Sequence, residues 1–152
     1  MKGESLPAGD HVVRYVKPSM ILEDGTPDGS DFRLRPHRPD EKGLSVNWLE
    51  AFEPPKTQQL SEVRRVFRLS VRRNGRFAEL DVGETLRAVS EELTTLRMIH
   101  DELEAADGFD KDPSHAQIVG LPLGDSDEAA LVGDLIAECV VYMHPAIVED
   151  SG

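Results

Sequence analysis

The sequence predicts one α+β domain, in which a mixed or antiparallel sheet of short strands carries about three packed helices. Three observations favour this fold class. The chain of 152 residues has the length of one domain. Short β-branched runs lie between Pro- and Gly-rich connections in the first third, and longer segments with apolar residues at helical spacing come after them. We expect the folded domain to span residues 11–145, with flexible ends at 1–10 and 146–152.

The first third is expected to form short strands. Residues 11–16 (HVVRYV) are β-branched and aromatic, and Pro18 limits this run. Residues 23–30 are rich in Gly, Pro and Asp, which favour turns. Residues 32–35 and 44–48 alternate in polarity, so each predicts a further strand with one apolar face.

The middle of the chain contains the strongest local signal. Residues 57–67 carry apolar side chains at helical spacing. Residues 68–73 and 76–82 are strand-like, and Asn74-Gly75 lies between them. Asn-Gly tolerates positive φ at both central positions of a tight turn, so this segment predicts a β-hairpin.

A second helix and two strands are expected next along the chain. Residues 84–93 have one apolar stripe at helical spacing. Residues 95–99 and 115–121 predict strands, and the residues between them, 100–114, predict an acidic loop.

The last helix is expected to begin near Asp125, whose spacing to Glu128 resembles a capping box, and to end before Pro145. From Ile136 onward it is apolar on most sides, which is typical of a helix buried in its own core or against a partner. Cys139 is expected to be a small core residue. Trp48, the single tryptophan, is either a core residue or an interface anchor. The predicted interface residues are Trp48, Ile136, Val140 and Met143.

Charge is distributed unevenly along the chain. The formal net charge is −12, and residues 101–152 contain one basic and 13 acidic residues. Arginines concentrate at positions 64, 65, 68, 72, 73 and 76. This run could contact nucleic acid, but the excess of negative charge makes that partner unfavourable, so we expect the acidic third to meet a basic partner or to face the arginine run. One cysteine and no long apolar stretch favour a reducing, cytoplasmic location and no membrane association.

Two His–carboxylate pairs flank the predicted acidic loop: His100-Asp101 and Asp112 with His115. Imidazole and carboxylate ligate zinc, manganese or iron, and they also form a general base with its orienting partner. These residues are therefore the candidate catalytic groups, and His100, Asp112 and His115 are the candidate ligands of a divalent metal. The alternative is that Asp112 caps a turn and the histidines bond backbone at strand ends.

A second polar group lies in the first third. If the strands at 32–35 and 44–48 pair, their outward faces place arginines beside small polar residues, where a phosphate or carboxylate could bind. The alternative is an ordinary solvated sheet face. The candidate ligand-binding residues are Arg14, Arg33, Arg35, Ser45 and Asn47, with His11 and Tyr15 on the same predicted face.

The leading functional hypothesis is a non-catalytic interaction or accessory domain, bacterial in style, that docks on another protein of basic character or on a second copy. It needs no cofactor. The apolar last helix, the one-sided acidity and the absence of a catalytic motif favour it. The alternative is a small metal-dependent hydrolase or nucleotidyl-type enzyme that uses the His–Asp pairs.

Overall fold

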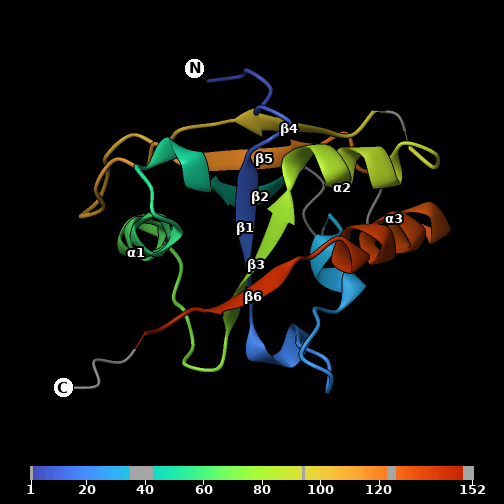
Figure 1. The fold of residues 1–152 in the computed structure, drawn as a ribbon, viewed down its shortest axis with the longest axis horizontal. Helices are drawn as coiled ribbons and strands as arrows, with labels where there is room; N and C mark the ends of the chain where they lie inside the picture. The colour runs from blue at the N-terminus through green and yellow to red at the C-terminus, as the bar shows by residue number, and fades with distance from the viewer. Residues whose placement is uncertain (1, 35–42, 94, 123–125, 149–152) are drawn as a thin grey trace.

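The computed structural model describes residues 2–34, 43–93, 95–122 and 126–148, which form one α+β domain around a six-stranded antiparallel sheet. The strand order is β4-β5-β2-β1-β3-β6, so β4 and β6 are the two edges (Figure 1). The fold class predicted from the sequence is confirmed. The strands are β1 His11–Val16, β2 Gly43–Trp48, β3 Arg76–Asp81, β4 Arg97–His100, β5 His115–Val119 and β6 Tyr142–Pro145, and the helices are α1 Lys56–Val66, α2 Val82–Val89 and α3 Asp127–Glu138, with short 3-10 helices η1 Pro18–Met20, η2 Gly29–Phe32 and η3 Leu49–Ala51.

Apolar cores lie on both faces of the sheet. Successive side chains of a strand point to opposite faces. Val12 accordingly packs in the larger core, which contains Ile136 of α3 and Val89 of α2, whereas Val13 packs in a smaller core with Val63 of α1. Figure 1 shows α1 on one side of the sheet, and α2 and α3 on the other. Burial on both faces explains why β1 contains two consecutive valines.

The predicted hairpin at Asn74-Gly75 is wrong. Residues 68–73 form no strand, and β3 pairs with β1 and β6 instead. A turn is present, closed by the Gly75 N–H and the Arg72 carbonyl at 2.9 Å, but tertiary pairing determines the partners of the strand after it. Glycine is needed there for space, because a Cβ on Gly75 would lie 2.6 Å from the Tyr15 ring.

The hairpin turn with positive φ lies in the predicted acidic loop. Asp107 and Gly108 have φ of 47° and 86°, as a type I′ turn requires. Backbone bridges Ala106↔Phe109 and Leu103↔Asp112 extend the pairing. We call residues 103–112 the acidic hairpin. Asp-Gly carries the same turn chemistry as Asn-Gly, so the local signal was present in the sequence at both sites.

Two further expectations are corrected. Phe32, the first residue of the strand expected at 32–35, instead ends η2, which begins where the Asp28 carboxylate accepts the Ser30 N–H at 2.9 Å. The last helix ends at Glu138, and residues 142–145 form the edge strand β6, where Pro145 is tolerated. The cap of α3 is Ser126, whose hydroxyl accepts the Ala129 N–H. Asp125 and Arg35 lie outside the described residues.

The two edges of the sheet differ in how far they are covered by other parts of the chain. The segment before β1, expected to be flexible, runs along the outer edge of β4: Leu6 N–H bonds the Met98 carbonyl, and His100 N–H bonds the Glu4 carbonyl. No strand of the described chain pairs with the outer edge of β6. Within the same residues, no helix has the length and apolarity needed to cross a membrane.

Candidate functional site

The His–Asp pairs flanking the acidic hairpin are held by structural hydrogen bonds. His100 Nε2 donates to the Pro113 carbonyl, and His115 Nδ1 donates to the Asp101 carbonyl, each at 2.7 Å. The geometry therefore agrees with the alternative interpretation, in which the histidines bond backbone at strand ends.

Asp112 also has a structural role. Its buried carboxylate accepts the backbone N–H and hydroxyl of Ser114 at 2.9 and 2.6 Å, and the Asn47 amide at 3.0 Å. This network ties the acidic hairpin to β2. His100, Asp112 and His115 do not form a group of close metal-ligand atoms, so the predicted metal site has no support in the geometry.

The early polar residues do not form one binding face. Asn47 is buried in the Asp112 network, whereas Ser45 is exposed. Arg14 lies opposite Ala78 of the larger core, and its guanidinium donates to the carbonyls of Asp31 and Ser45 at 2.8 Å. A strand at 32–35 was expected to place the arginines beside Ser45 and Asn47 on one face. Phe32, its first residue, belongs to η2 instead.

The start of the arginine run faces the acidic hairpin. Arg65 forms an ion pair with Asp110 at 3.0 Å, and Arg68 donates to the carbonyls of Glu104 and Asp110. The Arg68 guanidinium also lies over the Phe109 ring. This is one of the two expected arrangements for the acidic third, and it engages these two arginines within the domain.

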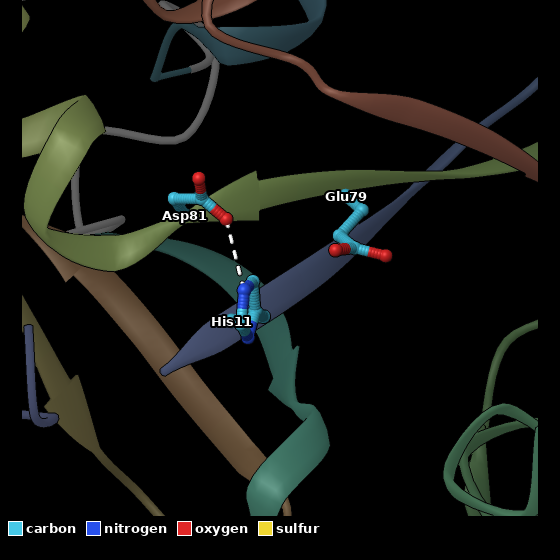
Figure 2. Close-up of side chains that lie close together, drawn as sticks. All are labelled: His11, Glu79 and Asp81. Carbon is cyan, nitrogen blue, oxygen red and sulfur yellow. Dashed lines mark ion pairs between the residues drawn. The ribbon is translucent and has the colours of Figure 1, made fainter. Parts of the chain in front are cut away.

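A different titratable cluster lies where β1 begins and β3 ends. The register pairs His11 with Asp81, and Glu79 lies two residues earlier on the same face of β3. One ring nitrogen of His11 and one carboxylate oxygen from each of Glu79 and Asp81 lie within 4.8 Å of one another (Figure 2). In the described chain, this is the group whose spacing could hold a metal ion.

Both ring nitrogens of His11 face carboxylates. Nδ1 lies 2.7 Å from Glu50 Oε2, and Nε2 lies 3.0 Å from Asp81 Oδ1. The His11 backbone N–H also donates to Glu50, at 2.7 Å. Glu50 comes after β2 in η3, so three elements fix the orientation of the imidazole.

Glu79 is the buried member of the cluster, with an exposed fraction of 2%. Burial raises the pKa of its carboxyl, but hydrogen bonds from His144 and Lys56 and the charges of both partners outweigh burial and bring the pKa to about 2. His144 is at 2.7 Å and Lys56 at 2.8 Å. Glu79 is therefore an ionised carboxylate inside the fold that ties β3 to β6 and to the start of α1.

The predicted interface residues divide into buried and accessible ones. Ile136 is fully buried in the larger core, so its side chain is not accessible at the surface of this domain. Trp48 is partly buried and donates from Nε1 to Asp10 at 2.9 Å. Val140 and Met143 are partly buried and line a groove of about 530 Å³. Cys139 is partly buried, and burial raises the pKa of its thiol, as expected for a packed residue rather than a nucleophile.

The groove lies between α3, β6 and the connection after β1. Leu22 and Pro27 of the connection after β1 line it, together with Ala137 of α3, Val140, and Met143 of β6. Asp134 and Glu138 add negative charge. The sequence pattern indicated Val140 and Met143 as interface residues but predicted a helix for both, because a short apolar run fits helix and strand alike.

Comparisons with protein-family models, with curated proteins and with solved structures give no match for this chain.

Proposed function

We propose that this domain is a non-catalytic interaction module that binds an extended, basic and apolar segment of another protein along the outer edge of β6. The observation that carries the proposal is the outer edge of β6, which no strand among the described residues pairs with and which lies beside an apolar groove with acidic residues. Adding a strand to an open sheet edge is a common mode of peptide recognition, in which main-chain hydrogen bonds give affinity and neighbouring pockets give specificity.

The register identifies the backbone groups available for pairing. Ala146 N–H bonds the Gly75 carbonyl, so residues 144 and 142, at alternate positions, direct their backbone groups toward β3. Met143 therefore directs its N–H and carbonyl away from the sheet. The Val141 N–H already donates to the Glu79 carbonyl at 2.9 Å, and the outward carbonyl of Pro145 accepts Arg64 at 2.7 Å, so the accessible backbone groups of the edge are those of Met143.

The side chains around this edge favour an apolar and cationic ligand. Val141 and Tyr142 are 53% and 62% exposed. Glu138 is the last residue of α3, where the carbonyl end of the helix dipole is also negative. The last turn of α3 contains no basic residue to balance it. Lysine or arginine side chains of a bound segment would supply that balance.

Charge also favours a different protein over a second copy. Each chain has a formal net charge of −12, so two copies repel at long range. A basic partner is attracted by the same field. The single cysteine, Cys139, fits the reducing cytoplasmic setting that we propose for this encounter.

The test uses two synthetic peptides of about ten residues, one alternating Val and Lys and one alternating Val and Glu, added to the ¹⁵N-labelled protein. We expect the Val–Lys peptide to shift the amide signals of Val141, Tyr142 and Met143 and of the end of α3, with weaker binding at higher salt. The Val–Glu peptide should leave these signals unchanged. Shifts confined to other surfaces, equal binding of both peptides, or a stable dimer through β6 would contradict the proposal.

A further inference from the structure

We propose that the cluster at the start of β1 and the end of β3 is a binding site for a divalent transition-metal ion, zinc in the first instance, with His11 Nε2, Asp81 and Glu79 as its ligands (Figure 2). This inference is independent of the β6 interface, from which it differs in ligand and in residues. One imidazole and two carboxylates form a three-ligand set of the kind that zinc uses where a further coordination position stays open.

The His11 ring is oriented as in a metal-binding histidine. Metal-binding histidines donate their other ring N–H to a carboxylate or a carbonyl, which fixes the tautomer and aims the ligating nitrogen. Glu50 Oε2 accepts a hydrogen bond from His11 Nδ1 at 2.7 Å, and this bond directs Nε2 toward Asp81. The imidazole therefore lies between the Glu50 carboxylate, which orients it, and the Asp81 carboxylate, which would be a second ligand of the ion.

A cation can also satisfy one of the two carboxylate contacts of the His11 ring. A neutral imidazole has one N–H, yet both nitrogens of His11 lie within hydrogen-bond distance of a carboxylate oxygen. An imidazolium donates to both carboxylates. A neutral ring with its proton on Nδ1 instead presents Nε2 to Asp81 at 3.0 Å as one acceptor facing another, and a cation between these two atoms makes that contact favourable.

The three ligand side chains need only a small adjustment to hold the ion. Bond lengths of about 2.1 Å place the ligand atoms of a tetrahedral zinc site about 3.4 Å apart. His11 Nε2 and Asp81 are already at 3.0 Å, and the whole group lies within 4.8 Å. The Glu79 oxygen therefore has to approach by at most about 1.4 Å, which a change in its side-chain torsions supplies.

Lys56 determines whether Glu79 is available. Its ammonium lies 2.8 Å from Glu79 Oε2, and its side chain is 46% exposed, so it can move into solvent. His144 holds the other oxygen at 2.7 Å and remains as an outer partner of the ligand. Zinc and the Lys56 ammonium thus compete for one carboxylate oxygen.

The experiment is calorimetric titration of the full chain with zinc chloride at pH 7, with melting measured alongside. We expect one ion per chain and a higher melting temperature that chelator reverses. His11→Gln and Asp81→Asn should each weaken binding at least about tenfold, and Glu50→Gln about 10- to 100-fold. Lys56→Gln should tighten binding several-fold, because the competing cation is removed.

His115→Gln is the matched control, because it removes an imidazole outside the cluster, and it should bind zinc as the wild type does. Circular dichroism confirms folding, and Asp81→Asn, which keeps the side-chain shape, decides the case if His11→Gln does not fold. Absence of stoichiometric binding, or binding that survives both substitutions, overturns the proposal.

Discussion

Replacing Glu79 by Gln tests whether the buried carboxylate stabilises the fold in its ionised form. The folded-state pKa is about 2, against 4.5 for an ordinary glutamate, because His144 and Lys56 outweigh the effect of burial. The folded protein therefore binds this proton less readily than the unfolded chain does. The resulting stability is present above about pH 4.5 and is lost as the pH falls toward about 2.

The magnitude comes from the same two pKa values. At about 1.4 kcal/mol for each tenfold difference in proton affinity, the full contribution is about 3 kcal/mol. At pH 2.5, about 2.5 kcal/mol of this should be lost. The variant has no ionisable group at this position, and the other carboxyl groups titrate in both proteins.

The assay is urea unfolding of the wild type and of Glu79→Gln from pH 7 to pH 2.5. We expect the variant to be less stable at pH 7, with a difference in free energy of unfolding that shrinks by about 2.5 kcal/mol over this range. A difference that stays constant with pH would refute the reasoning, because Glu79 would then contribute equally in both protonation states.

Three further predictions concern turns and charge. Gly75→Val should lower the free energy of unfolding by about 1–3 kcal/mol, measured with urea, because its Cβ would meet the Tyr15 ring at 2.6 Å; an unchanged value would exclude this contact. Gly108→Val should open the acidic hairpin to proteolysis, since φ is 86° there, whereas Asp107→Asn should be cut as slowly as the wild type. Binding to random duplex DNA at physiological salt should be weak by fluorescence anisotropy, because Arg65 and Arg68 are engaged by the acidic hairpin; tight, salt-sensitive binding would contradict this.

Local pattern was sufficient where neighbours in sequence determine the structure. The β-branched run at His11–Val16 predicted β1 with the bounds that the structure has. Helix α1 lies within a residue of its predicted range. In both cases the apolar spacing fits a single element type, and a proline lies close to one end.

Tertiary pairing explains the elements that pattern alone missed. Asn74-Gly75 and Asp107-Gly108 have similar turn chemistry. The strand that follows Asn74-Gly75 is β3, which already pairs with β1 on one side and β6 on the other, so it cannot pair with residues 68–73. The residues after Asp107-Gly108 pair with the residues before this turn. The apolar run before Pro145 fits a helix as well as a strand. Pairing with β3 makes it a strand, and this pairing brings His144 to Glu79.

The His11 cluster also depends on long-range register. His11 and Asp81 are far apart in sequence, and no motif spacing connects them. Their approach results from the pairing of β1 with β3, which a single sequence does not specify. His100 and His115, by contrast, were predicted as site residues because each has a carboxylate nearby in sequence. A ring nitrogen of each histidine bonds a backbone carbonyl instead.

The most direct test of the β6 interface is to block its outward backbone N–H and leave the fold in place. Met143→Pro removes an N–H that points away from β3, so the sheet should persist, whereas Met143→Ala keeps the N–H and loses only the side chain. We predict that the Val–Lys peptide binds Met143→Ala with at most a modest loss of affinity and that it no longer binds Met143→Pro, with circular dichroism unchanged in both. Equal binding to a folded Met143→Pro variant would contradict strand addition at β6.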